Sequence, residues 1–167
     1  MGLANCSSIT ILEKLYIKDL LDYQFGFGFG SKVLKSLGSV ERGKNGKIRR
    51  LYTETERLIA TLVPSTGLFS LSIAGGELLR QTFSKPRHRV IVPSSVSKYI
   101  RKGRNVFAKY VLEVDMLLRS GDEVIVVDEN DSLLAVGKLL LSPREARFFK
   151  RGVAVKVRKG LDRSSFK

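Results

Sequence analysis

The sequence predicts an α+β fold, in which a small N-terminal α+β domain is followed by a small β-barrel. Segments with apolar residues at alternate positions recur from residue 89 to residue 158, and short polar or glycine-containing turns separate them. Because these strands are confined to fewer than about eighty residues, a closed or nearly closed barrel is favoured over an open sheet. Cations gather at the turns and on one strand face, which indicates an anionic polymer as the ligand.

The N-terminal part combines helical and strand patterns. Two helices are expected first: residues 7–22, capped by Ser7 or Ser8 and most clearly amphipathic over Leu12–Leu21, and residues 31–37, ended by Gly38. The expected strands are 39–42, 48–52, 58–63 and 68–71. Asn45-Gly46 is a hairpin signal between the first two, and residues 64–67 form the last turn. A short helix over 73–82 completes this part.

The C-terminal part begins with a strand over 89–92 and a short helix over 94–100, which Gly103 is expected to end in a left-handed conformation. Strands are then expected over 105–112, 123–128 and 133–141, with a turn at 129–132. Ser142-Pro143-Arg144-Glu145 has the features of a capping box, so a helix is expected to begin there and to end near Gly152. A closing strand over 153–158 carries apolar residues at its odd positions.

The polar, proline-containing segment Ser84–Arg87 marks the expected domain boundary. We therefore expect an N-terminal domain over 1–86, a second domain over 87–160 and a tail over 161–167.

Phenylalanine and glycine alternate from Phe25 to Gly30, and this repeat has two interpretations. The rings could form a platform on which bases stack, with glycines that allow close backbone approach. Alternatively, the segment is a turn whose phenylalanines are buried in the core of the small domain. We favour the second interpretation, because a cluster of exposed phenylalanines is costly.

Charge is the unusual feature of the composition. The net charge is +14, the sequence pI is about 10.2, and 43% of the residues are hydrophobic, as in an ordinary globular protein. Residues 1–86 hold twelve Lys and Arg against seven Asp and Glu, and residues 87–167 hold eighteen against nine. Such an excess costs self-repulsion, which binding to a polyanion would turn into affinity through counterion release.

Several classes of site are excluded or disfavoured. With one cysteine, Cys6, and one histidine, His88, the chain has no internal disulfide framework and no multi-thiolate zinc site, and we expect neither a metal nor a cofactor. No apolar run approaches the roughly 20 residues that span a bilayer. We expect a cytoplasmic protein with no membrane partner. The acids Asp115, Asp122 and Glu123 are better explained by turns and strand ends than by catalysis.

The second half resembles a PUA domain. The residues that carry this resemblance are Gly103-Arg104-Asn105-Val106-Phe107-Ala108-Lys109, Gly121-Asp122-Glu123-Val124, Leu134-Ala135-Val136-Gly137 and 152–158. PUA domains are small RNA-binding pseudobarrels, so the resemblance implies a PUA-type β-pseudobarrel. The first half, through Tyr23-Gln24-Phe25-Gly26 and 66–71, is similar to the small domain that precedes PUA in archaeal tRNA-guanine transglycosylases, which implies an archaeal source.

That resemblance omits the catalytic part of the enzyme. The transglycosylases place their chemistry in a large barrel domain with paired aspartates and a thiol-rich zinc site, for which this chain has no room. The resemblance therefore implies a non-catalytic RNA-binding protein that recognises tRNA or a similar stem with a 3′ overhang. Two alternatives stay open: an RNA-binding subunit that works with a separate catalytic chain of an archaeosine-type tRNA-modifying enzyme, and a translation- or ribosome-associated factor.

The PUA family uses the edge between the helix and the following strand to hold RNA. A glycine there lets the backbone approach a phosphate–sugar ridge, and the neighbouring cations can contact phosphates. The resemblance points first to Arg101, Lys102, Gly103, Arg104, Asn105, Val106 and Lys109, and second to Lys138, Arg151, Lys156 and Arg158. In the expected strand over 105–112, Phe107 should face inward, but Lys109 has the same parity, which leaves a conflict.

Overall fold

The computed structural model describes residues 9–162, so Cys6, Ser7 and Ser8 lie outside the described residues. The chain forms two compact units, Met1–Leu78 and Leu79–Lys167, called unit 1 and unit 2 below. The division falls within helix α3 (Ile73–Thr82), a few residues before the segment at which we placed the domain boundary.

Unit 1 begins with helix α1 (Ile11–Phe25), whose N-cap is Thr10. The Thr10 hydroxyl accepts a hydrogen bond from the Glu13 backbone N–H, and the Glu13 carboxylate accepts one from the Thr10 N–H, which is a capping box. The expected start at residue 7 was therefore too early. The buried line of the helix is Ile17, Leu21 and Phe25, whereas Leu12, which we counted on the apolar face, is 78% exposed.

Glu13 also fixes α1 to the sheet of unit 1. Its carboxylate accepts hydrogen bonds from both terminal nitrogens of Arg42, of which the Nη2–Oε2 distance is 3.0 Å. The hydrogen bond from Arg42, followed by the one from the Thr10 backbone, lowers the pKa of Glu13 from 4.5 to about 2.

The alternating Phe-Gly segment is mainly structural, as we favoured. Phe25 and Phe29 are buried, with ring centroids 5.1 Å apart in an edge-on arrangement, while Phe27 is 88% exposed. The N–H groups of Gly28 and Gly30 donate to one oxygen of Asp22. A Cβ on Gly30 would lie 2.3 Å from the Lys18 carbonyl oxygen, so helix α2 (Phe29–Ser36) can approach α1 only with glycine at this position.

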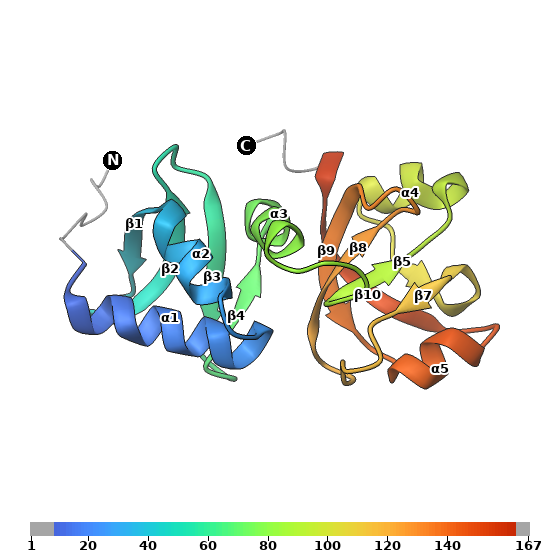
Figure 1. Ribbon diagram of the computed structural model, residues 1–167, viewed down its shortest axis with the longest axis horizontal. Helices are drawn as coiled ribbons and strands as arrows, with labels where there is room; N and C mark the ends of the chain where they lie inside the picture. Colours follow the sequence, from blue (N-terminus) through green and yellow to red (C-terminus); the bar gives the residue numbers. More distant parts are fainter. Residues whose placement is uncertain (1–8, 163–167) are drawn as a thin grey trace. The chain divides into compact units, whose positions relative to one another are not determined.

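A four-stranded antiparallel sheet follows the two helices, with its strands in sequence order: β1 (Leu37–Arg42), β2 (Ile48–Thr53), β3 (Leu58–Val63) and β4 (Leu68–Leu71) (Figure 1). The expected turns are present, with Gly46 and Gly67 at positive φ. The side-chain amide of Gln24 pairs with edge strand β4, donating to the Phe69 carbonyl and accepting from its N–H. The helices are thereby fastened to the free edge of the sheet.

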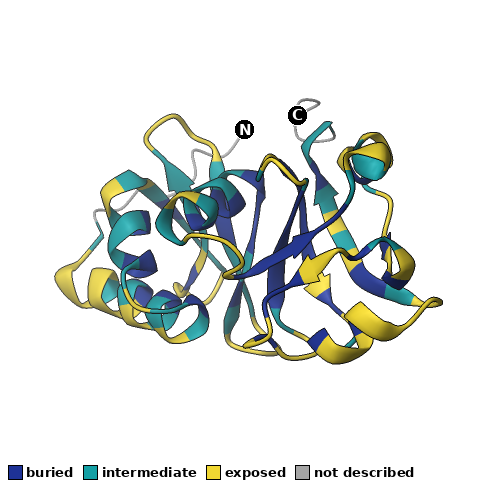
Figure 2. Cartoon of the chain, turned by 45° about the vertical axis from the view of Figure 1, so that its right-hand side comes forward, coloured by how far each residue is buried: buried dark blue, intermediate teal, exposed yellow. Residues whose placement is uncertain are grey.

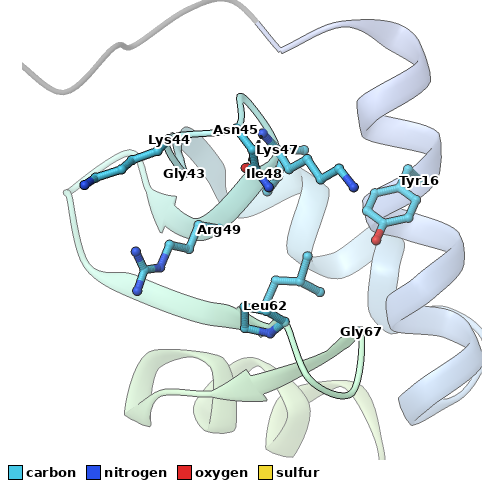
Figure 3. A pocket seen from close by; sticks show the side chains of 10 residues that line it. Tyr16, Gly43, Lys44, Asn45, Lys47, Ile48, Arg49, Leu62 and Gly67 are labelled. Atoms are coloured by element: carbon cyan, nitrogen blue, oxygen red, sulfur yellow. Dashed lines mark hydrogen bonds between the residues drawn. The ribbon is translucent and has the colours of Figure 1, made fainter.

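The surface of unit 1 has a hollow of about 640 Å³ beside the hairpin of β1 and β2 (Figure 3). It is lined by Tyr16 of α1, by hairpin residues 43–45 and 47–49, and by Leu62, Pro64 and Gly67 from β3 and the turn after it.

Unit 2 contains a six-stranded mixed sheet with the order β6-β10-β9-β8-β5-β7. Its strands are β5 (Arg89–Ile91), β6 (Val106–Phe107), β7 (Glu113–Val114), β8 (Glu123–Val127), β9 (Leu133–Leu139) and β10 (Val153–Gly160). β5 and β8 are parallel, and the other pairs are antiparallel. The helical elements are the 3₁₀ turns η1 (Ser94–Val96) and η2 (Ala108–Tyr110), and the helices α4 (Ser97–Arg101) and α5 (Pro143–Phe148).

This sheet has to curl, because its two edge strands are close neighbours in sequence. A flat sheet of this size would hold its edges about 24 Å apart, at roughly 4.8 Å for each pair of strands. Only residues 108–112 connect β6 to β7, and part of this segment is coiled into η2. The curled sheet encloses a core to which β8 contributes Val124 and Val126 and β9 contributes Leu134, Ala135 and Leu139; all five residues of β8 are buried (Figure 2). The predicted α+β class with a pseudobarrel second domain is confirmed.

One long strand of the prediction was wrong. Residues 105–112, expected as a single strand, form β6, then η2, and then the two-residue connection 111–112 to β7. Val106 and Ala108 face the core, and Phe107 is 47% exposed. The parity conflict is thereby removed, because Phe107 and Lys109 both point outward. Helix α5 begins with the expected capping box at Ser142 but ends at Phe148, before Gly152.

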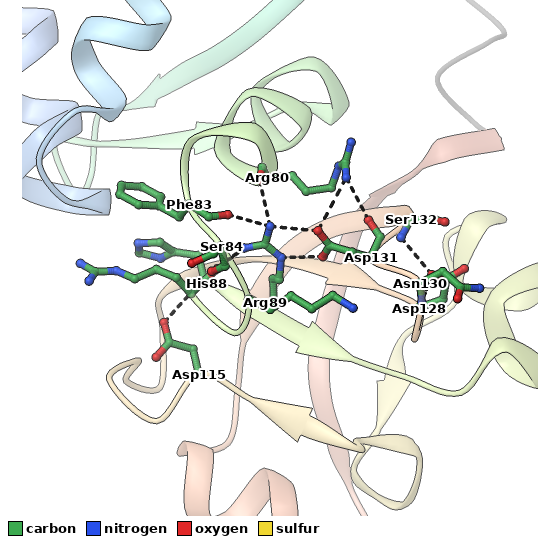
Figure 4. A network of polar contacts seen from close by, with 12 residues as sticks. Arg80, Phe83, Ser84, His88, Arg89, Asp115, Asp128, Asn130, Asp131 and Ser132 are labelled. Carbon is green, nitrogen blue, oxygen red and sulfur yellow. Dashed lines mark hydrogen bonds and ion pairs between the residues drawn. The ribbon is translucent and has the colours of Figure 1, made fainter.

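The guanidinium of Arg89 is the buried polar centre of unit 2, with 1% of the side chain exposed (Figure 4). Its Nε donates to Asp131 Oδ1 at 2.7 Å, and Nη2 donates to the other carboxylate oxygen. The same side chain donates to four backbone carbonyls, those of Arg80, Phe83, Ser84 and Arg87. It therefore joins β5 to the end of α3 and to the turn between β8 and β9.

Replacing Arg89 by Met should destabilise unit 2 by about 3 kcal/mol, since the change leaves several buried carbonyls without their donor and leaves the Asp131 carboxylate paired only with Arg80, at 3.6 Å. Urea denaturation followed by circular dichroism measures the loss. Arg144→Met, at an exposed position of α5, is the matched control and should change stability by less than about 0.5 kcal/mol. Equal stability of the two variants would contradict the structural role of Arg89.

The pairing of Glu13 predicts a specific acid sensitivity of unit 1. Because the pKa of Glu13 is lower in the folded protein than its ordinary value, its stabilising effect is complete above about pH 4.5 and is lost as the pH falls towards 2. Thermal melting across this range should therefore show a smaller pH dependence for Glu13→Gln than for the unchanged protein. Parallel curves would refute the assignment.

Candidate nucleic-acid interface

The turn between α4 and β6 has the geometry of a Schellman motif. The Arg104 N–H donates to the Tyr99 carbonyl at 3.2 Å, and the Gly103 N–H donates to the Ile100 carbonyl at 2.8 Å. Gly103 has φ of 89°, which a side chain would disfavour. The left-handed C-cap that the sequence predicted is thus present, and it turns the chain sharply between two basic residues.

Strand β10 packs directly against this turn. A Cβ on Gly160, at the end of the strand, would lie 2.1 Å from the Arg101 carbonyl oxygen and 2.6 Å from the Gly103 nitrogen. The side-chain oxygen of Asn105 accepts a hydrogen bond from the Val157 N–H at 3.0 Å. Asn105 therefore positions the turn on β10, in addition to any contact with a ligand.

The cations of the turn differ in how they are paired. Arg101 forms an ion pair with Asp162, with 3.0 Å between Nε and Oδ1, and both side chains are more than 40% exposed. Lys102 and Arg104 are exposed, and within residues 9–162 neither forms an ion pair. These two side chains are the cations of the turn that are available to an external anion.

Two other first-choice candidates have different positions. Val106 is fully buried in the core of unit 2, so its side chain cannot touch RNA, and we remove it from the candidate side chains. Lys109 lies on η2 and is exposed, with its ammonium 4.8 Å from the centre of the Tyr110 ring.

The second-choice candidates on the sheet form one group around a buried acid. Lys138 on β9 is paired in register with Lys156 on β10 and with Glu123 on β8. Arg158 binds the Glu123 carboxylate with both terminal nitrogens, one of them at 2.8 Å. Arg158 is thus engaged, whereas Lys138 and Lys156 stay exposed beside each other.

Strand β10 links these groups. Its start lies next to β6, where Gly152 accepts a hydrogen bond from the Ala108 N–H, so the exposed Arg151 belongs to the end near η2. Lys156 and Arg158 occupy its middle, and Gly160 touches the α4–β6 turn. At about 3.3 Å per residue, the candidates are spread over roughly 25 Å along one strand.

The sequence prediction missed Tyr99. This residue of α4 is 61% exposed, and its backbone carbonyl accepts the hydrogen bond of Arg104 in the Schellman motif, so Tyr99 is attached directly to the basic turn. An aromatic residue just before a basic segment was a usable signal, because base stacking on aromatic side chains accompanies phosphate contacts in many RNA-binding proteins.

The acids have structural roles, as expected. Asp115 accepts hydrogen bonds from the backbone N–H groups of His88 and Leu117, and Asp122 accepts one from Arg119. His88, next to the expected domain boundary, is buried with φ of 57°, and its ring packs against Phe83. Within residues 9–162 no cluster of metal-ligating side chains is found, and no helix could cross a membrane.

Comparisons with known families divide the chain in two. Residues 16–86 match the patch-forming domain C2 of tRNA-guanine transglycosylase, and residues 88–161 match the PUA domain. The resemblance stated from the sequence is confirmed for both parts.

The curated relatives are archaeal enzymes named tRNA-guanine(15) transglycosylase. The protein from Thermococcus kodakarensis is 38% identical over 148 residues, which are 89% of this chain and 25% of that protein. The protein from Pyrococcus furiosus is 41% identical over the same shares of both chains. This chain therefore spans about a quarter of the length of these relatives.

Solved structures share the fold of most of the chain. A hypothetical protein from Pyrococcus horikoshii OT3 superposes with a TM-score of 0.68 at 24% identity, covering 88% of this chain and 89% of that one. A conserved PUA domain protein from Thermoplasma acidophilum gives 0.61 at 20% identity, with coverages of 88% and 87%.

The positive φ of Gly103 predicts a graded response to substitution. Gly103→Ala should lower stability by about 1–2 kcal/mol, and Gly103→Asn by less, because asparagine tolerates the left-handed conformation better. Urea denaturation of both variants checks the order. A larger loss for Asn than for Ala would be inconsistent with the described turn.

Proposed function

Because the chain carries a C2 domain followed by a PUA domain, we propose that it is a non-catalytic RNA-binding protein whose ligand is tRNA or a similar stem with a 3′ overhang. The observation that carries the proposal is the α4–β6 turn, at which Lys102 and Arg104 stand exposed on either side of Gly103. The backbone of Gly103, which carries no side chain, can approach the phosphate–sugar backbone of an RNA, and the two unpaired cations can contact its phosphates. Tyr99 is available to stack on an unpaired base.

The choice of tRNA rests on the relatives. Their name includes tRNA, and this chain aligns along most of its length with about a quarter of each. We propose that the aligned part acts on the same class of RNA, in the cytoplasm, through its shape and its single-stranded end.

One alternative is an RNA-binding subunit of a tRNA-modifying enzyme. A chain that corresponds to two domains of a larger enzyme could present tRNA to a separate catalytic chain. Co-purification of a tRNA-modifying chain that depends on this protein for activity would support that alternative. The RNA contacts proposed for the turn are the same in both cases.

Removing the two unpaired cations of the turn should weaken RNA binding without unfolding the protein. Lys102→Ala with Arg104→Ala is expected to reduce affinity for total tRNA about ten- to hundredfold, equivalent to about 1.4–2.8 kcal/mol. The control is Arg144→Ala with Arg147→Ala, which removes the same charge from α5. Fluorescence anisotropy at constant salt gives both affinities. Equal losses would mean that only net charge matters, and no loss would refute the site.

The salt dependence separates contact from general attraction. Each lost phosphate contact should reduce the slope of log K against log salt by roughly 0.7–0.9, so the turn variant should fall by about 1.4–1.8. Binding to duplex DNA and to tRNA trimmed at its 3′ end provides the comparison. A preference for intact tRNA that survives near-physiological salt supports end recognition, whereas equal binding to all three would contradict it.

A further inference from the structure

We propose that the hollow on unit 1 is a second RNA contact, which holds one unpaired nucleotide with its base on Tyr16 and its phosphates on the cations of the β1–β2 hairpin. This inference rests on the proposed RNA-binding function and deepens it, because it adds a contact on unit 1 to the α4–β6 turn of unit 2.

The size and lining of the hollow fit a nucleotide. Its volume of about 640 Å³ lies within the range of roughly 300–1,000 Å³ that is usual for small-molecule sites. The lining combines the half-exposed ring of Tyr16 with the aliphatic side chains of Ile48 and Leu62. A site for phosphate alone would gain nothing from these apolar groups, whereas the face of a base would pack against them.

The rim supplies the charge that the phosphates require. Lys44, Lys47 and Arg49 line the same hollow, all three are exposed, and Lys47 extends from the hairpin towards Tyr16 (Figure 3). Among the ion pairs of the described residues, none involves these three cations. Gly43 and Gly46 place no side chains in the hairpin turn, so the sugar–phosphate backbone of the RNA could pass close beside it.

The acids of this region are already engaged by other cations. Glu13 lines an adjoining pocket that shares Tyr16 and Lys47 with the hollow; it binds Arg42 and keeps its charge down to about pH 2. Glu41 is bound by Arg50 and by the Tyr52 hydroxyl at 2.9 Å, which lowers its pKa. Since each of these carboxylates is matched by an arginine, the three rim cations remain in excess, and the hollow is complementary to an anion with an aromatic group.

The test compares two tyrosines of the same helix. Tyr16→Ala should weaken binding of a fluorescently labelled tRNA about tenfold, because stacking of one base is lost. Tyr16→Phe should restore most of the affinity. Tyr23→Ala is the matched control, since Tyr23 is 83% exposed on α1 but does not line the hollow, and it should leave affinity unchanged. Circular dichroism verifies that each variant is folded.

A second variant tests the phosphate contacts independently of the ring. Lys44→Ala, Lys47→Ala and Arg49→Ala together should reduce the salt dependence of tRNA binding, whereas Lys14→Ala, Lys32→Ala and Lys35→Ala remove the same charge from the two helices and should reduce it less. Photo-crosslinking with 4-thiouridine placed in single-stranded positions of the tRNA should label the peptide that contains Tyr16 or the hairpin.

The outcomes separate this inference from the proposed function. If Tyr16→Ala and the hairpin variant bind tRNA like the unchanged protein, while Lys102→Ala with Arg104→Ala still binds weakly, the second contact is refuted and the proposed function stands. If the unchanged protein fails to bind tRNA at all, both are refuted. A tenfold loss for Tyr23→Ala equal to that of Tyr16→Ala would also overturn the assignment to the hollow.

Discussion

The buried guanidinium of Arg89 is the interaction on which the second unit depends. Desolvating a charge costs several kcal/mol, so it is tolerated only where every donor has a partner. Here all three nitrogens are engaged, with Asp131 supplying the countercharge and four carbonyls taking the remaining hydrogens. Two of these carbonyls, of Arg80 and Phe83, lie at the end of α3, where unpaired acceptors and a negative partial charge favour a cation. Arg89 thus caps the end of α3, joins β5 to the turn between β8 and β9, and neutralises Asp131.

Asp131 can serve this arrangement because its own turn is fixed. Asp128 accepts hydrogen bonds from the N–H groups of Asn130 and Ser132, and Asp131 itself has φ of 63°. The turn between β8 and β9 therefore presents a carboxylate in one defined direction. With β5 held at that end, the sheet can curl and bring β10 against the α4–β6 turn, where Gly160 leaves room for the backbone of Arg101 and Gly103.

Local chemistry made much of this predictable. Gly46, Gly67 and Gly103 have the positive φ that their turns required, and the capping box at Ser142 is present. The expected strand over 105–112 was wrong, because the chain forms the 3₁₀ turn η2 there although apolar and polar residues alternate. Closure of the sheet depends on contacts between residues far apart in sequence, which a local pattern does not show. The burial of Arg89 was not predictable either. In sequence it is one of thirty cations, and the acid that selects it lies forty-two positions away.

The same reasoning applies to the candidate sites, because a count of cations does not locate an interface. Arg42, Arg50, Arg89 and Arg158 are engaged by acids or carbonyls, and these pairings are set by tertiary contacts that no local pattern encodes. What distinguishes Lys102, Arg104, Lys47 and Arg49 is that the neighbouring carboxylates are already matched. In the two proposed contacts the acids therefore matter as much as the bases, because Asp162 is paired with Arg101 and Glu13 and Glu41 are paired with Arg42 and Arg50, so that the other cations nearby are not neutralised. In unit 1 the unpaired cations line the same hollow as a tyrosine, and in unit 2 they flank a glycine turn that follows a tyrosine, so both proposed contacts combine charge suited to phosphate with a ring suited to a base.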